Sequence, residues 1–411
     1  MRRFLIAFCL AGLAPVGAQA SDFGGLVLVK GVVQEGRDAG LALPGVDFDA
    51  RTIETAAVFE GSNGGLRYRL RAEAFGSAEA GWPAKSDVRL KELSYGRRIN
   101  EAWSYSVGVQ QRSWDSSLAY APLGFFRART DLSDPFDSEA RQEGLPLIVV
   151  TRLGHKVNME AIVSERLSRG TQADRLNGRQ AALRISGDPL PGVNAALVVR
   201  QRAGARAGVG ASATYQVGAV EIHADAFYGP AQAGYAYRGF TDLAPQFYVS
   251  DPFPLVKAGP STLRSGVGMT WTPTDSLTIR TEWSHRDDGL SANDWARYRT
   301  AIAVHRAALA GPGFGKGFQN LAYDLTALRS VAQRDQVFVM ASFEHAKITY
   351  SASRLTGMDD QSSVTNLSVG GLLAYKVNFN VGVSAFSGEL GTQFGLLPIK
   401  GSAFATLGRP F

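Results

Sequence analysis

The feature that most limits how this chain can fold is an alternation of side chains with a period of two over residues 263–286. Two arms flank the turn 273–276, and their mostly apolar face consists of Ser265, Val267, Met269 and Trp271, then Leu277, Ile279, Thr281 and Trp283. Polar residues and glycines occupy the opposite face. This is the periodicity of a pleated strand, and about ten residues suffice for a tilted strand to cross a bilayer core. The stretch therefore predicts a hairpin with one face toward lipid and the other toward water.

The whole chain contains eighteen segments of this kind. They cover residues 23–34, 52–60, 66–76, 88–97, 103–112, 145–153, 157–165, 178–186, 193–201, 206–216, 220–229, 263–272, 277–286, 335–344, 348–355, 364–375, 377–387 and 397–411. The first and sixth are ambiguous because their alternation is weak. The predicted fold is all-β, a transmembrane antiparallel up-and-down β-barrel of about 18 strands, or 16 if one weak hairpin is lost.

The connections between these segments alternate between short and mostly longer ones. Tight turns include 62–65, 154–156, 217–219 and 273–276, whereas long connections include 113–144, 230–262 and 287–334. Transmembrane barrels have short periplasmic turns and longer external loops. Outward aromatic residues also cluster near the tight-turn ends, as expected for a girdle at the headgroup level. They are Tyr68, Tyr95, Trp103, Tyr105, Tyr215, Trp271, Phe343, Tyr350, Tyr375 and Phe379, with Tyr228 and Trp283 near the other ends.

Composition excludes several other classes of protein. Arg2 and Arg3 precede the apolar run 4–13, and 18–20 reads Ala-Gln-Ala, so residues 1–20 are expected to be a cleaved signal peptide. Without them, 41 basic and 37 acidic residues remain, a balance too mild to indicate nucleic acid. The single cysteine, Cys9, lies in that peptide, so the mature chain 21–411 is expected to have neither disulfides nor thiolate metal sites. The mature chain has no stretch of about eighteen uncharged apolar residues, so a helical membrane protein is excluded.

The last segment ends in Phe411, with Ala403, Ala405 and Leu407 on the same face. With a signal peptide and amphipathic strands before it, the chain resembles Gram-negative outer-membrane β-barrels of the porin superfamily. The resemblance implies residence in the outer membrane, contact with its lipid and lipopolysaccharide, and recognition of Phe411 by the barrel insertion machinery. Strand number and charge are loosely similar to those of substrate-specific or acidic-polysaccharide export porins.

Arginine exceeds acid on the predicted water-facing side of the strands. The basic residues there are Arg67, Arg69, Arg71, Arg89, Arg112, Arg152, Arg184, Arg200, Arg264 and Arg280, and the acidic ones are Glu73, Glu92, Glu160, Glu221, Asp225, Glu282 and Glu344. In a low-dielectric wall such an excess attracts anions or acidic sugars. The alternative is that these charges pair across strands and only fill a wet interior.

Residues 113–144 form a long charged loop after the fifth segment. It resembles the inward-folded constriction loop of porins, whose opposed charges select polar solutes. The charged residues that would do so are Asp115, Arg127, Arg129, Asp131, Asp134, Asp137 and Glu139. An external loop held by its own salt bridges remains the alternative.

Residues 287–334 are the one region expected to be helical. Ser291 can cap a helix that ends at Gly311-Pro312. Two apolar stripes, with Trp295, Tyr298 and Ile302 in the first and Leu321 and Leu325 in the second, would let two short helices pack together as a lid or partial plug over the pore. The loop 230–262 is rich in aromatic residues, which either form a sugar path or pack against the barrel mouth.

These observations favour a porin-like channel for passive passage of small hydrophilic, anionic or acidic-sugar solutes. A closed barrel that binds or assembles surface polysaccharide or a partner protein is the alternative, and a lipid- or glycan-modifying enzyme is a third possibility. Among five histidines only His223 has carboxylates on its own face, Glu221 and Asp225. No catalytic set, cofactor or metal site is predicted, and the sequence leaves the oligomeric state open.

Overall fold

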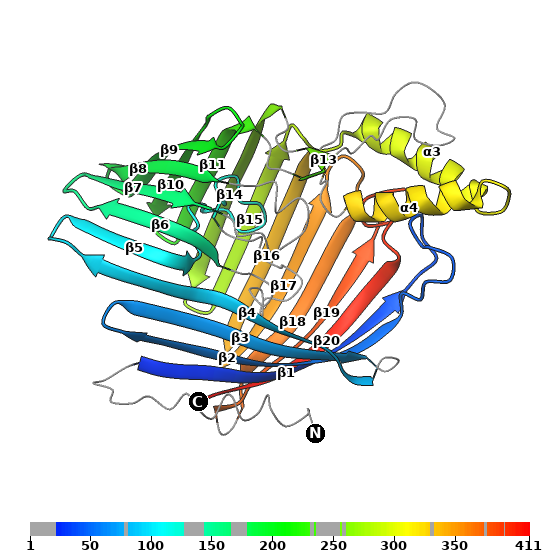
Figure 1. The fold of residues 1–411 in the computed structure, drawn as a ribbon, viewed down its shortest axis with the longest axis horizontal. Coiled ribbons are helices and arrows are strands. Elements are labelled where there is room, and N and C mark those ends of the chain that lie inside the picture. Colours follow the sequence, from blue (N-terminus) through cyan, green and yellow to red (C-terminus); the bar gives the residue numbers. More distant parts are fainter. Residues whose placement is uncertain are drawn as a thin grey trace.

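A computed structural model describes residues 22–77, 81–126, 144–165, 179–230, 234–235, 255–256, 260–328, 333–373, 376–389 and 391–411. Eighteen strands of these ranges form one antiparallel sheet. Each strand pairs with the next in the chain, and β1 (Asp22–Gly36) pairs with both β2 (Ala50–Asn63) and β20 (Ile399–Pro410), so the sheet closes into a barrel (Figure 1). The predicted up-and-down barrel of eighteen strands is confirmed, and the sixteen-stranded variant is wrong.

The remaining strands and the two helices have the following bounds. The strands are β3 (Leu66–Ser77), β4 (Gly81–Arg98), β5 (Trp103–Gln110), β6 (Leu145–Arg152), β7 (Val157–Ser164), β8 (Gln180–Leu190), β9 (Val193–Arg202), β10 (Gly208–Val217), β11 (Val220–Pro230), β14 (Ser261–Thr274), β15 (Leu277–Arg286), β16 (Asp335–His345), β17 (Ile348–Gly357), β18 (Ser363–Leu372) and β19 (Asn378–Ser387), with a separate pair β12 (Gly234–Tyr235) and β13 (Leu255–Val256). The helices are α3 (Ala292–Ala308) and α4 (Phe314–Leu328). Residues 231–233, 236–254 and 257–259 of the loop 230–262, the predicted outward Tyr375 and the predicted signal peptide lie outside the described residues.

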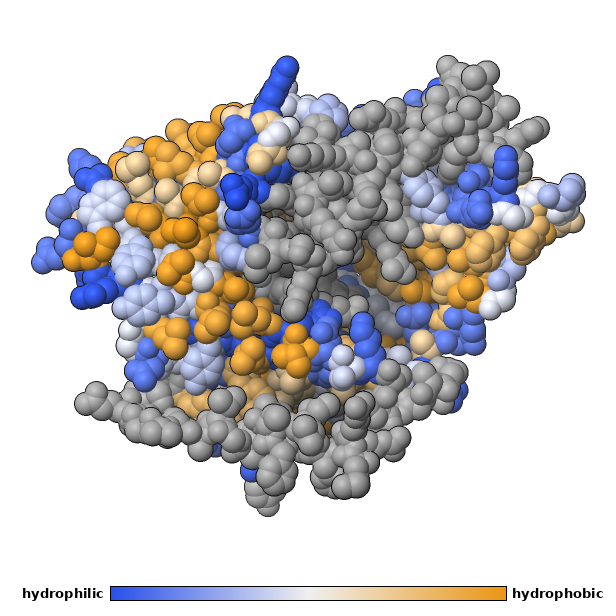
Figure 2. Space-filling model, viewed as in Figure 1, coloured by the Kyte–Doolittle hydropathy of each residue, from blue (hydrophilic) through white to orange (hydrophobic). Residues whose placement is uncertain are grey.

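The outer wall of the barrel is apolar and the interior is polar. Along β14, for example, Leu263 and Val267 are exposed, whereas Arg264 and Gly266, which lie between them in the chain, are buried. Exposed apolar side chains continue over the left part of Figure 2, where β5 to β9 lie. Because exposed apolar groups on a barrel wall are stable only against hydrocarbon, this surface is the lipid face.

One prediction about which face a residue occupies is wrong. Arg152, at the end of β6, is on the outward face with Ile148, and its guanidinium lies 5.9 Å from the Trp103 ring centroid. The inward face of β6 carries Leu147 and Val149 instead. At the short-turn edge of the wall, an outward arginine can place its charge at the headgroup level while its stem stays in the apolar layer.

The helical region of 287–334 forms as predicted. Ser291 caps α3, since its Oγ accepts a hydrogen bond from Asp294 N while the Asp294 carboxylate accepts one from Ser291 N, and α3 ends before Gly311. Among the described residues no helix has the length and apolarity to cross a membrane. In Figure 1 both helices lie beyond the long-loop ends of β19 and β20.

Candidate functional site: a lumen narrowed by residues 113–126

Residues 113–126, which we call the inner segment, fold into the barrel after β5. Arg112 N donates to Phe126 O at 3.2 Å, and the two residues form an antiparallel bridge that closes the neck of this loop. Asp115 Oδ1 accepts a hydrogen bond from Leu123 N within the loop at 2.5 Å. The described part of 113–144 is therefore held together by hydrogen bonds within the segment.

A carboxylate on the inward face of β11 holds one part of the inner segment. Asp225 Oδ2 accepts hydrogen bonds from Ser116 N at 2.9 Å, Ser117 N at 3.0 Å and Ser117 Oγ at 3.0 Å. Asp225 is 2% exposed, so these donors replace the water that the carboxylate would otherwise bind. Charge-assisted hydrogen bonds of this kind are about twice as strong as neutral ones.

A second carboxylate, Glu282 of β15, holds the next two residues. Its oxygens accept hydrogen bonds from Leu118 N at 2.8 Å and Ala119 N at 2.8 Å. Arg280, two residues earlier on the same face, pairs with Glu282 at 2.6 Å and also donates to Ser116 O. Consecutive backbone N–H groups of the inner segment thus face two buried carboxylates on β11 and β15, the two strands that flank β14.

His223 lies beneath these two carboxylates. Its ring is buried, with Nε2 at 3.5 Å from Glu282 Oε1 and Nδ1 at 4.0 Å from Glu221 Oε1. Gly268 makes room for it, because a side chain there would meet His223 Nε2 at 2.5 Å. The predicted grouping of His223 with carboxylates is present, but Ser117 Oγ bonds to Asp225 rather than to an imidazole, so the cluster supports the loop and does not form a nucleophilic triad.

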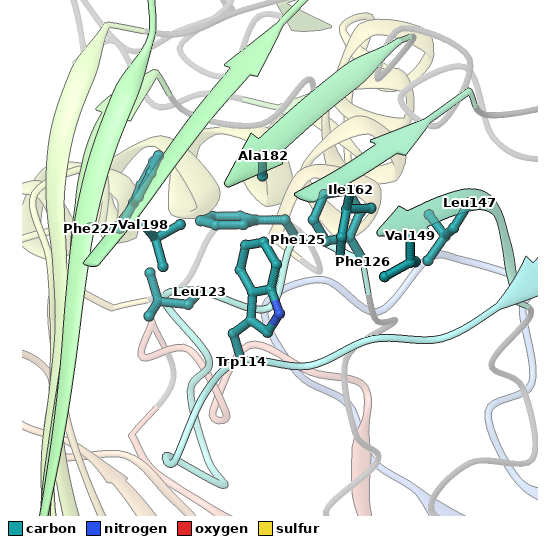
Figure 3. Packing of buried hydrophobic residues seen from close by; sticks show 10 residues of the cluster. All are labelled: Trp114, Leu123, Phe125, Phe126, Leu147, Val149, Ile162, Ala182, Val198 and Phe227. Carbon is teal, nitrogen blue, oxygen red and sulfur yellow. The ribbon is translucent and has the colours of Figure 1, made fainter. Parts of the chain in front are cut away.

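The inner segment also buries an apolar cluster against the barrel wall. Trp114, Phe125 and Phe126 have ring centroids 5.6 to 6.5 Å apart and are mutually edge-on. Figure 3 shows these rings between the inner segment and the strands that bear Ile162, Val198 and Phe227. The inward face of β6 to β11 is therefore covered here by side chains rather than by water.

Arginines also contact aromatic rings of the inner segment. The Arg200 guanidinium lies 4.5 Å from the Phe125 ring centroid and donates to Gln180 Oε1, and Arg286 lies 5.4 Å from the Tyr120 ring centroid. Arg264 is paired with Arg286 on the inward face of β14 and β15. Between Arg200 and Arg264, the Phe227 ring packs over Gly208 and Gly229, where any side chain would meet it.

At the long-loop rim, Asp288 pairs with two of these arginines. Its carboxylate is 3.2 Å from Arg264 Nη2 and 3.1 Å from Arg286 Nε. Burial would raise the pKa of Asp288, but the charges of Arg286 and Arg264 outweigh burial and hold its pKa below the ordinary value of 3.8. Asp288 therefore stays ionised at neutral pH and partly neutralises the arginines at this rim.

The inward face of β2 to β4 carries a separate ion-pair network. Arg71 is 2% exposed and contacts Glu54 at 2.6 Å and Glu73 at 2.9 Å, and Glu73 also meets Arg89 at 2.6 Å. Arg69, by contrast, is 45% exposed and pairs with the exposed Glu60 at 3.3 Å. On this wall the arginines predicted to face the lumen therefore include both buried structural pairs and hydrated ones.

Some of the predicted site residues lie elsewhere or beyond the described ranges. Arg127, Arg129, Asp131, Asp134, Asp137 and Glu139 of the expected constriction loop are outside the described residues. Arg67, Arg112, Arg184 and the arginines above are described, and their action on a solute stays a prediction. Some arginines near the inner segment were not among the predicted site residues. Arg202 lies one position past the predicted segment 193–201, and Arg286 is the last residue of the predicted segment 277–286. Among the described residues no group of three His, Asp or Glu is arranged to hold a metal ion.

The predicted apolar stripes of the helices are buried against two long connections. Trp295, Tyr298, Ile302 and Leu321 are at most 3% exposed and pack on Leu41 and Leu396, and Leu325 packs at the edge of the same cluster. Between the helices, His305 Nδ1 lies 3.3 Å from Asp324 Oδ2. The hairpin α3–α4 is thus fixed to the β1–β2 and β19–β20 connections at the barrel mouth.

The fold is that of the Occ/OprD porins. Solved structures with this architecture include Acinetobacter baumannii OccAB1, with a TM-score of 0.56 and 10% identity over 95% of this chain and 96% of that one. Pseudomonas aeruginosa OccK5 (OpdH) has a TM-score of 0.53 and 7% identity over 95% and 98%, and Pseudomonas aeruginosa OprD has 0.51 and 10% over 95% of both chains. No protein-family model and no curated protein matches the sequence.

Proposed function

We propose that this protein is an outer-membrane channel through which small hydrophilic solutes pass passively. The observation that carries the proposal is the inner segment, which is anchored inside a closed barrel by Asp225 and Glu282 and so narrows the lumen. The structural neighbours, the Occ/OprD porins of Gram-negative outer membranes, are substrate-specific channels for small solutes rather than enzymes. An apolar outer wall and a polar interior support the same role.

We further propose a preference for anions, including acidic sugars. Around the inner segment, Asp225 and Glu282 are turned to backbone N–H groups, whereas the buried Arg200, Arg202 and Arg264 add positive charge to the inward face of the adjacent strands. In a low-dielectric lumen, an excess of fixed positive charge lowers the barrier for anions and raises it for cations. The hairpin α3–α4 is proposed as a partial lid over the mouth.

The proposed partners follow from the location of the protein. The outward aromatic side chains would lie at the two headgroup levels, with lipopolysaccharide around the long-loop end. Phe411, whose ring centroid lies 5.8 Å from that of Phe59, is proposed as the residue that the insertion machinery reads.

Planar-bilayer recording tests both the channel and its selectivity. The purified barrel should show steady single-channel conductance, and a salt gradient should give a reversal potential that favours anions. Replacing Arg200 and Arg264 with methionine, which keeps much of their apolar packing, should move that potential toward zero. Arg409→Gln, on the outward face of β20, removes a positive charge from the chain but not from the lumen and should leave it unchanged. A barrel without conductance would instead indicate the closed binding barrel.

A further inference from the structure

A groove of about 520 Å³ lies on the lipid face of the wall formed by β16 to β19. Two rows of outward side chains line it, and each row runs across the four strands in register. Ala341 and Ala352 are directly paired and continue to Leu367, and Phe343 and Tyr350 are directly paired in the adjacent row. A volume of 300 to 1,000 Å³ is typical of ligand sites, so the groove is large enough to hold part of a ligand.

The groove exists because small and large side chains alternate along these strands. The rings of Phe343 and Tyr350 are stacked with centroids 6.5 Å apart and form a raised edge toward the short turns. The small side chains of Ala341 and Ala352 leave the backbone between these rings and Leu367 less covered. The lining is almost wholly apolar, and apolar surface is more stable in contact with hydrocarbon than with water.

The position of the groove along the strands places it in one leaflet. Phe343 is two residues and Ala341 four residues from His345, where β16 ends at its short turn. At about 3.3 Å per residue along a strand, the groove lies roughly 7 to 13 Å from that end. The apolar band of such barrels is about 25 Å tall, so the groove lies in the half next to the short, periplasmic turns. This leaflet of a Gram-negative outer membrane consists of phospholipid.

Two lysines stand at the short-turn end of the same four strands. Lys347 belongs to the β16–β17 turn and Lys376 to the β18–β19 turn, and both are exposed. Each has a positive φ, 69° and 59°, which fixes it at the tip of its turn. Among the described residues, neither of these turns contains an acidic side chain, and alternation directs Glu344, near the end of β16, to the lumen. The groove thus has apolar walls and a positively charged end at the headgroup level.

We propose that this groove holds an acyl chain of an anionic phospholipid of the periplasmic leaflet, with the lipid phosphate between Lys347 and Lys376. Apolar burial of the chain and attraction of the headgroup act together, because the lysines lie beyond the groove in the direction of the membrane surface. A second copy of this chain fits less well. A two-fold contact through this face would set the lysines of one copy near the same lysines of the other.

Native mass spectrometry of the purified barrel, titrated with phosphatidylglycerol or with phosphatidylethanolamine of the same chains, tests the proposal. Each lysine near an anionic surface contributes about 1 kcal/mol, or about fivefold in affinity, so the first phosphatidylglycerol should bind roughly 25-fold more tightly than phosphatidylethanolamine. The variant Lys347→Asn/Lys376→Asn should abolish that difference. Asparagine tolerates positive φ, so both turns are kept. Lys156→Asn, in the exposed β6–β7 turn, is the matched control and should bind as the parent does.

Filling the groove tests the site of the acyl chain separately. Ala341→Leu/Ala352→Leu should remove the first tight phosphatidylglycerol, whereas Ala211→Leu, at an exposed outward position of β10, should not. Far-ultraviolet circular dichroism establishes that each variant keeps its strand content. Equal affinity for the two lipids, or tight binding that survives both the lysine and the leucine changes, would overturn the proposal. A dimer that the leucine changes dissociate, with no lipid preference, would assign the groove to a second copy.

Discussion

Replacing Asp225 with asparagine should release part of the inner segment and change how the channel conducts. The carboxylate accepts three hydrogen bonds from Ser116 and Ser117, at 2.9 to 3.0 Å. Asparagine keeps the size of the side chain and one carbonyl oxygen but removes the negative charge. The hydrogen bonds that the asparagine oxygen still accepts are then between uncharged groups. In one of the two orientations of the amide, its NH₂ group, also a donor, faces the donors of the inner segment.

The magnitude follows from the number of hydrogen bonds. A hydrogen bond to a charged group contributes about 1.5 to 3 kcal/mol, and one between neutral groups about 0.5 to 1.5 kcal/mol. Three bonds would each lose roughly 1 kcal/mol, and because they share one acceptor the total should be about 2 to 3 kcal/mol. This is a factor of roughly 30 to 150 in the equilibrium between the anchored and released inner segment. Glu282 still holds the neighbouring residues, so release should be local.

Single-channel recording at a fixed salt concentration measures this release. The Asp225→Asn channel should show a larger mean conductance, or frequent transitions to a larger level, whereas the parent should be steady. Glu221→Gln is the matched control, since it removes the same charge from the inward face of β11 and contacts His223 rather than the inner segment. If Asp225→Asn and Glu221→Gln record alike, the anchoring argument is refuted and only lumen charge matters.

Three further predictions concern stability. Arg71→Ala should lower the free energy of unfolding by about 3 to 5 kcal/mol, because the buried carboxylates lose their partner. Arg69→Ala removes one member of an exposed pair and should lower the free energy of unfolding by less than about 1 kcal/mol. Unfolding in a urea titration should distinguish the two variants. Trp114→Ala should weaken docking of the inner segment by about 3 to 5 kcal/mol and Trp114→Phe by less, measured by limited proteolysis. For Asp288, the charge of Arg286 outweighs burial and lowers the pKa. The contribution of the ionised Asp288 to protein stability is therefore complete well above pH 3.8 and is lost as pH falls below that value. Melting temperatures measured over a pH series, with Asp288→Asn as control, should show this loss.

The strands and helices could be predicted because their signals are local. Alternation with a period of two fixes which residues share a face, and the tight turns set where each strand ends. Ser291 and the two apolar stripes likewise predict α3 and α4 without knowledge of any distant residue. Each of the eighteen predicted segments overlaps one strand of the closed barrel.

The error at Arg152 has a physical cause that also explains why the sixth segment was ambiguous. Leu147 and Val149 face inward but are apolar because Trp114 and Phe126 of the inner segment cover them. A strand with lipid on one face and aromatic rings on the other has no polar face, so its alternation disappears. The inward Ile162 and Val198 are apolar in the same way. Apolar residues at inward positions are therefore the sequence signal that an apolar segment covers this wall inside the barrel.

The anchors of the inner segment could not be predicted from local patterns. Asp225 is 109 residues from Ser116, and Glu282 is 164 residues from Leu118. Their alternation showed only that they face inward, as several other acidic residues do. Which of them meets a loop depends on the closure of the whole barrel and on the path of that loop through the lumen.

The contacts of the inner segment on opposite walls determine where solute can meet the protein. The aromatic residues at both of its ends pack on β6 to β11, and Ala119 in its middle joins a cluster with Phe338 of β16 and Leu355 of β17. The inner segment therefore spans the lumen and is held on both sides. The described residues that remain hydrated on an inward face include Arg67 and Arg69 of β3, which lie on the wall that these contacts leave uncovered. We therefore expect a solute that passes the inner segment on this side to meet Arg67 and Arg69, whereas the buried pairs of Arg71 already have their partners.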